Sequence, residues 1–186
     1  ETGMITDNML SVIIPVSNRQ TLYATLESTK EAKEVIVVAD GKCPISEEIC
    51  KNFNNVKYYE LMETGDYGAS QRNFGMRVAT QPLISFLDDD DVYVEGGVEK
   101  IISYSKLNSL NLFKVKFRNF VIWDSTEIQY GNVCTVGMVV PNNLSKVGVW
   151  TARYGHDLDF AEMTFNLIGS VNFVDFILTR VRPHEQ

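Results

Sequence analysis

Cysteine is scarce in this sequence. The chain contains only Cys43, Cys50 and Cys134, an odd number with no CxxC spacing. This pattern argues against a disulfide framework and against a cysteine-ligated zinc site, and it favours a reducing compartment. No charged segment followed by an apolar one begins at Met4, so no signal peptide is indicated. We therefore expect a cytoplasmic protein.

Long apolar runs and basic clusters are also missing. No run approaches the roughly 20 apolar residues that a membrane-spanning helix needs, so no membrane span is predicted. The 17 basic residues are scattered among 24 acidic ones, for a formal net charge of −7. That balance disfavours nucleic acid or an anionic membrane as a partner.

The length and composition fit one domain. The chain has 186 residues, 45% of them hydrophobic, which is enough for a sizeable core. We predict a single domain over residues 4–186, with two halves of different character at 4–105 and 106–186. The three residues before Met4, Glu1 to Gly3, are typical of an expression scar and are left out of the fold prediction.

The first hundred residues alternate short apolar segments with amphipathic ones. Strands are expected at 9–15, 34–39, 56–59 and 82–87, and helices near 22–26, 44–53, 69–80 and 94–105. Ser17 and Asn18 are expected to cap the first of these helices. The alternation predicts an α/β fold with a mostly parallel, Rossmann-like sheet flanked by helices. Ligands of such sheets bind outside the carboxyl ends of the strands.

The second half predicts a small antiparallel addition to that sheet. Extended segments are expected at 112–117, 120–123 and 135–140, with polar turns at 124–125 and 130–132. A short helix capped by Asn142 and Asn143 is expected to end near Gly148, and a longer helix to span 157–168. Two closing strands are expected at 171–174 and 176–181.

Four consecutive acids, Asp88 to Asp91, follow the apolar run Pro82 to Leu87. A buried strand cannot hold four acids, so they are expected where the strand leaves the sheet. Four adjacent anions repel one another, and a hard divalent cation with oxygen ligands is a natural partner; a solvated acidic turn is the alternative. Asp40 ends another predicted strand, so two strands direct acids at one crevice.

Six short motifs fall at loops or strand ends. They are IIPVSNR at 13–19, VVADG at 37–41, GASQRNFG at 68–75, FLDDDD at 86–91, YGHDLD at 154–159 and RVRPH at 180–184. In this order and spacing the chain resembles the inverting family-2 glycosyltransferases of the GT-A fold, in a compact version. Two departures from the family pattern are Ala39 in place of an acid and His156 in place of a glutamate.

The resemblance implies a metal-dependent transfer of a sugar, of the hexosyltransferase type, from a nucleotide-sugar donor. The implied donor contacts are Pro15, Val16, Ser17, Asn18, Asp40, Gly68, Arg72, Asp88 and Asp89. Asp40 would accept the imide N–H of uracil, which indicates a UDP-sugar; a plain Asp-Gly turn is the alternative. Residues 4–105 then form the nucleotide-binding half and 106–186 the acceptor-binding, catalytic half.

The resemblance also implies a metal site of the DXD type. Asp90 is the implied ligand, Asp88 the implied ribose contact, and either Asp89 or Asp91 could substitute. His184 resembles a histidine that completes the metal shell, and an imidazole ligand would shift the preference from Mg²⁺ toward Mn²⁺. The alternative for His184 is a frayed terminal residue.

Asp157 is the implied general base, which takes a proton from the acceptor hydroxyl. The alternative role for Asp157 is an N-cap of the helix that follows, and both roles are compatible. Asp159 is expected to support the helix dipole or to contact the acceptor. Trp150 and Tyr154 could stack on a sugar, although a Trp packed on the sheet is the commoner arrangement. The acceptor is a saccharide or another hydroxyl compound.

Two other functions stay open at this point. A sugar-nucleotide pyrophosphorylase has a similar half-fold, but it needs a glycine-rich loop after the first strand, and residues 15–18 contain no glycine. A catalytically inactive or non-enzymatic nucleotide- or metal-binding module of the same fold is the other alternative, because His156 departs from the pattern. The acid run lacks the spacing of an EF-hand calcium loop.

Overall fold

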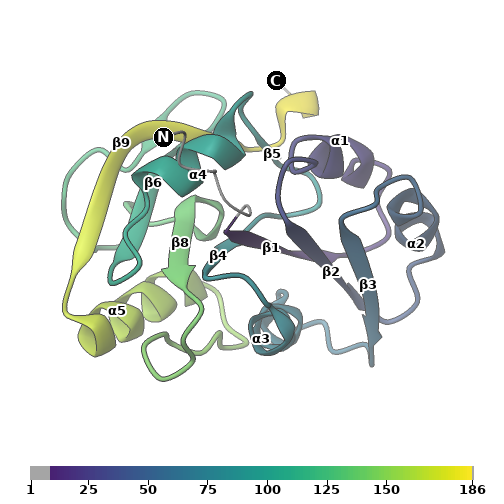
Figure 1. Cartoon of the computed structure of the whole chain (residues 1–186), viewed down its shortest axis with the longest axis horizontal. Helices are drawn as coiled ribbons and strands as arrows, with labels where there is room; N and C mark the ends of the chain where they lie inside the picture. Colours follow the sequence, from purple (N-terminus) through teal and green to yellow (C-terminus); the bar gives the residue numbers. More distant parts are fainter. Residues whose placement is uncertain (1–8, 186) are drawn as a thin grey trace, which may run out of the picture.

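The computed structural model describes residues 9–185, and in them one mixed sheet of nine strands runs through the molecule (Figure 1). The strands are β1 (Leu10–Val16), β2 (Glu34–Asp40), β3 (Val56–Leu61), β4 (Leu83–Phe86), β5 (Val92–Tyr93), β6 (Leu110–Lys116), β7 (Val121–Ile122), β8 (Met138–Pro141) and β9 (Val171–Arg180). Their spatial order is β3-β2-β1-β4-β8-β6-β9-β5, and β7 pairs with β6. The expected expression scar lies outside the described residues.

Five α-helices and two short 3-10 turns accompany the sheet in the described residues. They are α1 (Leu22–Glu27), α2 (Pro44–Cys50), α3 (Ala69–Val78), α4 (Gly97–Tyr104), α5 (His156–Ile168), η1 (Thr135–Gly137) and η2 (Pro183–Glu185). Side chains of α1, α2 and α4 belong to one apolar cluster, and those of α3 and α5 belong to a second. The two clusters cover opposite faces of the sheet, as Figure 1 shows.

The parallel part of the sheet follows directly from the sequence. β1 lies between β2 and β4 and is parallel to both, and β2 is parallel to β3. β1 and β2 are almost entirely buried because helices cover both of their faces, which explains their continuous runs of valine and isoleucine. The predicted α/β fold with a mostly parallel, Rossmann-like half is confirmed.

The antiparallel addition is also confirmed, although its details differ from prediction. β8 pairs antiparallel with β4 and with β6, so it joins the two halves of the chain into one sheet. The two closing strands expected after α5 are one strand, β9, which is parallel to β6. Irregular register on either side of Lys114 lets β9 continue past Asp175, where the sequence suggested a break.

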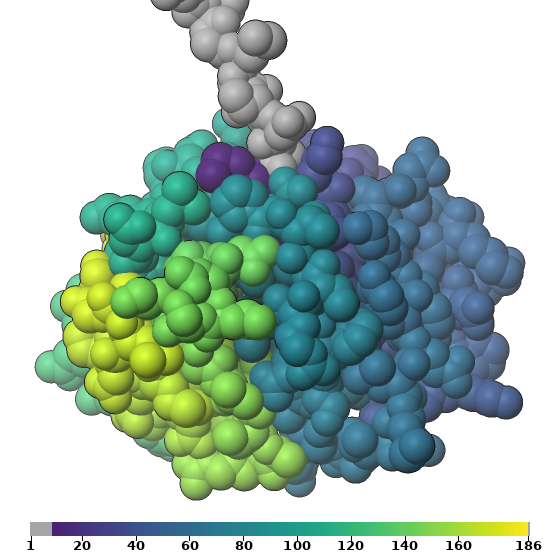
Figure 2. All heavy atoms as spheres, turned by 60° about the horizontal axis from the view of Figure 1, so that its bottom comes forward, coloured from purple at the N-terminus to yellow at the C-terminus, as the bar shows by residue number. Residues whose placement is uncertain are grey.

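The short helix expected between Asn142 and Gly148 is absent. The Asn142 side chain does not cap a helix; its Nδ2 donates to the carbonyl oxygens of Ala79 and Gln81, at 2.9 Å each. These bonds tie the segment after β8 to the end of α3. In Figure 2 the green surface of the second half lies directly against the blue-teal surface of the first half.

The loop after β1 caps a different helix from the one predicted. α1 begins only at Leu22, and Thr21 is its N-cap. Asn18 instead adopts a left-handed backbone conformation, and its Oδ1 accepts from the backbone N–H of Ile45 at 2.8 Å, at the start of α2. The prediction placed this asparagine on the neighbouring helix in sequence, but its side chain reaches the neighbouring helix in space.

Candidate active site

The four acids after β4 do not form a uniform charged cluster. Asp89 and Asp91 are buried, whereas Asp88 and Asp90 are partly exposed. β4 ends at Phe86 and the run forms a turn, in which the Asp91 N–H donates to the Asp88 carbonyl oxygen at 3.2 Å, so neighbouring acids differ in burial. The structure therefore separates the run into two outward carboxylates and two inward ones.

Asp88 pairs with Arg72, which comes from the first turn of α3. Arg72 Nη2 donates to Asp88 Oδ1 at 2.9 Å, and Arg72 itself is buried. Gly68, the N-cap of α3, has a φ of +82°, and a Cβ there would lie 3.0 Å from Arg72 Nη1. Glycine suits this position for two reasons: it adopts the left-handed backbone conformation readily, and its lack of a Cβ leaves space for the guanidinium.

Asp89 holds the loop that follows β1. Its Oδ2 accepts from the backbone N–H of Ser17 at 2.9 Å, and its carbonyl oxygen accepts from the Thr21 hydroxyl at 2.8 Å. Burial raises the pKa of Asp89. Since this carboxylate lies inside the protein and is committed to Ser17, it has a structural role at the edge of the site.

The other two acids also have partners in the protein. Arg19 Nη1 donates to Asp90 Oδ2 at 2.7 Å, while half of the Arg19 side chain stays in solvent. Asp91 Oδ1 accepts from the backbone N–H of Arg182 at 2.9 Å and so fixes the residues after β9. Burial raises the pKa of Asp91 to about 8.

Asp40 lies at the carboxyl end of β2 and supports a second loop. Its Oδ1 accepts from the backbone N–H of Thr64 at 2.7 Å, and its Oδ2 accepts from that of Gly65 at 3.0 Å. The Thr64 hydroxyl adds a third bond at 3.2 Å. A carboxylate can accept about four hydrogen bonds, so Asp40 keeps capacity for a ligand.

These strand ends surround a polar cavity of about 340 Å³, which we call the polar cavity. Of the predicted site residues, Pro15, Val16, Ser17, Asp40, Gly68, Arg72, Asp88, Asp89 and Asp90 line it. The sequence analysis did not single out four further lining residues, Arg19, Gly65, Tyr67 and Gln71. Arg19 is the last residue of the motif at 13–19, and Tyr67 directly precedes the motif that begins at Gly68.

Two of the residues predicted to bind the donor or the metal lie elsewhere. Asn18 caps α2, and His184 lies in η2, where its Nε2 is 3.6 Å from Glu185 Oε1. Within residues 9–185 no three histidine, cysteine or acidic side chains come together in a way that could hold a metal ion. Asp88, Asp90 and His184 therefore do not form a three-residue site.

The donor set of the polar cavity nevertheless suits a hard divalent cation. Asp88 and Asp90 present carboxylate oxygens to the same cavity. Mg²⁺ is commonly bound by one or two carboxylates together with substrate phosphates, and it does not need a complete cage of protein ligands. Two outward acids thus fit a metal that a diphosphate helps to hold.

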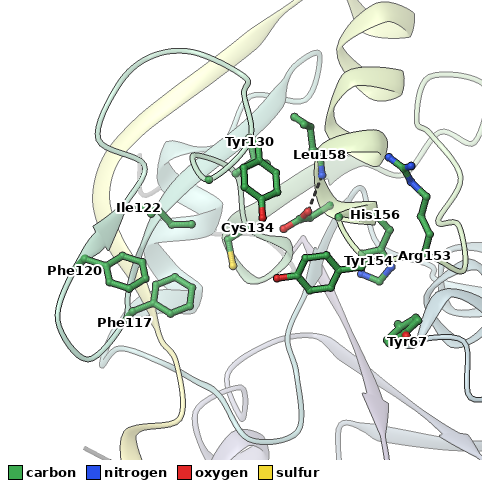
Figure 3. A pocket seen from close by; sticks show the side chains of 14 residues that line it. Tyr67, Phe117, Phe120, Ile122, Tyr130, Cys134, Arg153, Tyr154, His156 and Leu158 are labelled. Carbon is green, nitrogen blue, oxygen red and sulfur yellow. Dashed lines mark hydrogen bonds between the residues drawn. The ribbon is translucent and has the colours of Figure 1, made fainter.

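Asp157 belongs to a second cavity of about 340 Å³, which we call the aromatic cavity. Figure 3 shows Tyr130 and Tyr154 projecting into it, with Phe117 and Phe120 on one side and Tyr67 toward the other. Asp157 lies in the first turn of α5, whose N-cap is Gly155, so the predicted N-cap role of Asp157 is wrong. Tyr67 lines both cavities.

His156 connects the two cavities. Its Nδ1 lies 3.2 Å from the carbonyl oxygen of Thr151, and its Nε2 lies 3.5 Å from Arg72 Nη1. A carbonyl only accepts and a guanidinium only donates, so both neighbours select the neutral imidazole with its proton on Nδ1. Burial, followed by the nearby charge of Arg72, lowers the pKa of His156.

The remaining residues of this region have structural roles. Asp159 accepts from Arg153 Nη2 at 2.8 Å and from Arg153 Nε, so its carboxylate is occupied. Trp150 is buried and stacks on Phe160 with ring centroids 4.0 Å apart, which is the packing role expected as the commoner one. Tyr154, by contrast, is exposed.

Asn73, next to Arg72 on α3, holds the loop that precedes α5. Its Nδ2 donates to the Trp150 carbonyl oxygen, and its Oδ1 accepts from the Trp150 N–H, both at 2.9 Å. One asparagine thus satisfies both backbone groups of a residue in the loop before α5. The motif at 68–75 therefore both lines the polar cavity, through Gly68 and Arg72, and holds the loop before α5.

No helix within residues 9–185 combines the length and the apolar character that crossing a membrane requires. Among solved structures, the chain is similar to S. aureus TarS (residues 1–349), with 16% identity and a TM-score of 0.74 over 92% of this chain and 60% of that chain. A structure of the same protein in complex with UDP-GlcNAc gives a TM-score of 0.73 at 16% identity, over 92% of this chain and 58% of that one. This likeness confirms the predicted GT-A fold.

The sequence itself is similar to curated glycosyltransferases. An uncharacterized glycosyltransferase of Rickettsia bellii is 35% identical over 114 residues, which are 57% of this chain and 16% of that protein. The glycosyltransferase GlyA of Streptococcus pneumoniae is 34% identical over 112 residues, 54% of this chain and 16% of that protein. The chain thus spans less than a fifth of the length of these relatives. The sequence model described as Glycosyl transferase family 2 matches residues 11–122, more than half of the chain, and the chain therefore belongs to glycosyl transferase family 2.

Proposed function

We propose that this chain transfers a sugar from a UDP-sugar to an acceptor hydroxyl with inversion at the anomeric carbon. The observation that carries the proposal is the pair of adjoining cavities that share Tyr67. One cavity presents carboxylates at strand ends, and the other contains a carboxylate in a wall of aromatic side chains. A donor and an acceptor bound in these two places would meet beside Tyr67.

The polar cavity is the proposed donor site. Asp40 retains an acceptor position for the imide N–H of uracil, and Asp88 and Asp90 face the place proposed for the diphosphate. When bound, a divalent ion held by Asp88 and Asp90, Mg²⁺ or Mn²⁺, supplies neutralisation of the charge that builds on the leaving diphosphate. Arg72, held by Asp88, keeps a second positive charge at the wall of this cavity.

Asp157 is the proposed general base. It would take the proton of the acceptor hydroxyl as that oxygen forms its bond to the anomeric carbon, while the bond from this carbon to the diphosphate breaks on the opposite face. Asp157 lines the aromatic cavity, and within the described residues its carboxylate accepts a hydrogen bond from the Leu158 N–H at 2.8 Å. Asp159 is the neighbouring acid, but Arg153 occupies it.

The test combines binding and turnover. Calorimetric titration of UDP with Mn²⁺, with Mg²⁺ and with EDTA should show tight binding only when a divalent ion is present. Release of UDP from a panel of UDP-sugars should then be measured with and without candidate acceptors. UDP binding that EDTA leaves unchanged would refute the metal bridge, and absence of UDP release from every donor would refute the transferase.

A further inference from the structure

Exposed aromatic side chains gather at one place on this molecule. Tyr67, Phe120, Tyr130 and Tyr154 are 56–84% exposed, and all four line the aromatic cavity. Leaving large rings in water is unfavourable, so a concentration of them around one hollow marks a surface that a ligand covers. The fold does not need these rings for its core, because the two apolar clusters contain none of the four.

Contacts within the protein hold part of this aromatic lining in place. Phe117 and Phe120 stack with centroids 4.7 Å apart and planes 9° apart, and the Phe117 N–H bonds to the Phe120 carbonyl oxygen. The loop that carries Tyr130 is fixed by buried Asn132, whose Nδ2 donates to the carbonyl oxygens of Ser125 and Glu127, at 2.6 and 2.7 Å. Such preorganisation reduces the entropy that binding would cost.

The charges around the aromatic cavity do not favour binding of an anionic ligand. Arg153 is its only cationic lining residue, and both of its donor groups toward Asp159 are occupied. His156 is the neutral tautomer, and Asp157 contributes a negative charge. Recognition of phosphate or carboxylate relies on guanidinium or ammonium charge, and among the described lining residues the one such charge is already paired with Asp159.

The lining combines flat apolar faces with polar groups at their edges. The hydroxyls of Tyr130 and Tyr154 reach into the cavity from different sides in Figure 3. A pyranose has the matching character, since its C–H faces are apolar and its hydroxyls surround the ring. A volume of about 340 Å³ is near the lower end of ligand sites, which begin at about 300 Å³, so the cavity accommodates the end of a glycan.

From these observations we propose that the acceptor is a neutral saccharide, whose terminal ring lies against the aromatic side chains and presents a hydroxyl to Asp157. The inference rests on the proposed transferase function and adds the chemical class of the acceptor. The competing candidate is a phosphate-bearing acceptor, because Arg118 and Arg182 line a separate small cavity that also borders Phe117.

Ligand-observed saturation-transfer NMR on the full chain tests this inference. The probes are methyl glycosides of glucose, galactose and N-acetylglucosamine, each beside its 6-phosphate. The variant is Tyr130→Ala, and the control is Tyr104→Ala, which removes a partly exposed ring on α4 that does not line the cavity. UDP titration of every protein reports on the donor site independently.

We expect saturation of the ring protons of at least one neutral glycoside and weaker signals from its phosphate. Tyr130→Ala should weaken that binding about tenfold, as loss of one aromatic contact implies. Tyr104→Ala should leave glycoside binding unchanged, and both variants should bind UDP as the wild type does. Stronger binding of the phosphates, no saturation of any neutral glycoside, or equal effects of the two tyrosine variants would overturn the inference. If the wild type did not bind UDP, the proposed function would be refuted instead.

Discussion

Arg72 Nη1 lies 3.5 Å from His156 Nε2, and this contact places a cation of the polar cavity against a neutral ring of the aromatic cavity. The motif that residues 154–159 resemble has a glutamate at the position of His156. Arg72 already pairs with Asp88, so a glutamate would place a second carboxylate beside it, whereas the neutral imidazole accepts a hydrogen bond and adds no charge. The sequence analysis noted the substitution, and the geometry gives it a consistent role.

Protonation of His156 is expected to destabilise the fold. Its pKa in the fold is lowered from 6.5, so the unfolded chain binds the proton more readily. The stability that neutral His156 contributes is therefore complete above about pH 6.5 and is lost as the pH falls from there through the lowered pKa. Asp157 and Asp88 oppose part of this shift.

The measurement is the difference in unfolding free energy between wild type and His156→Gln from pH 5 to pH 8. The variant should lose less stability on acidification than the wild type, because glutamine accepts from Arg72 without titrating. His184→Gln is the matched control, since His184 is the only other histidine and is exposed. Parallel curves for wild type and His156→Gln would contradict the prediction.

Asp157→Asn should abolish sugar transfer while UDP binding stays nearly unchanged. Asparagine is almost isosteric and its Oδ1 can still accept from the Leu158 N–H, so the local structure survives. It cannot accept a proton from the acceptor. Turnover is measured on one donor and acceptor pair, with Asp159→Asn as the neighbouring control. Near-wild-type transfer by the Asp157 variant would remove this residue as the base.

Asp90→Ala and Asp89→Ala should separate binding from folding. Asp90 faces the polar cavity, so its loss should abolish metal-dependent UDP binding and change stability by less than about 0.5 kcal/mol. Asp89 is buried and accepts from Ser17, so its loss should cost about 1–3 kcal/mol. Chemical denaturation and UDP titration of both variants check this, and the reverse pattern would show that the outward acid is the structural one.

Arg19→Gln should increase the affinity of the protein for Mn²⁺ alone. The guanidinium of Arg19 pairs with Asp90, so a metal ion that uses this carboxylate must displace it. An ion pair with a half-exposed partner is worth at most about 1 kcal/mol, which limits the gain to about fivefold. Calorimetric titration of Mn²⁺ without nucleotide measures it, with Arg77→Gln as control. An unchanged or weaker affinity would mean that Arg19 does not compete.

The parallel half of the fold could be predicted because its signals are local. Runs of buried valine and isoleucine end at Pro15 and at Asp40, and both faces of such strands must be covered. Hydrogen bonds between residues distant in the sequence could not be predicted in the same way. Asn142 looked like a helix cap, but its amide is used by Ala79 and Gln81.

The lining of the polar cavity was predictable for a related reason. Its residues stand at the ends of parallel strands, where topology brings them together whatever the loops do. Which acids of the run point inward and which outward depends on how the chain leaves β4. Because all four residues are aspartates, the sequence does not distinguish them. The aromatic cavity forms where the loops that contain Phe117, Tyr130 and Tyr154 come together. The spacing of these residues in the sequence does not predict that they are close in space.

Tyr67 has a consequence for how binding at the two cavities is linked. Its backbone has a φ of +60°, its carbonyl oxygen accepts from Arg72, and its ring forms part of both cavities. Because one residue lines both cavities, we expect a ligand in one cavity to change the affinity of the other. Linkage makes such coupling reciprocal, so whatever factor UDP applies to the acceptor's dissociation constant, the acceptor must apply to that of UDP.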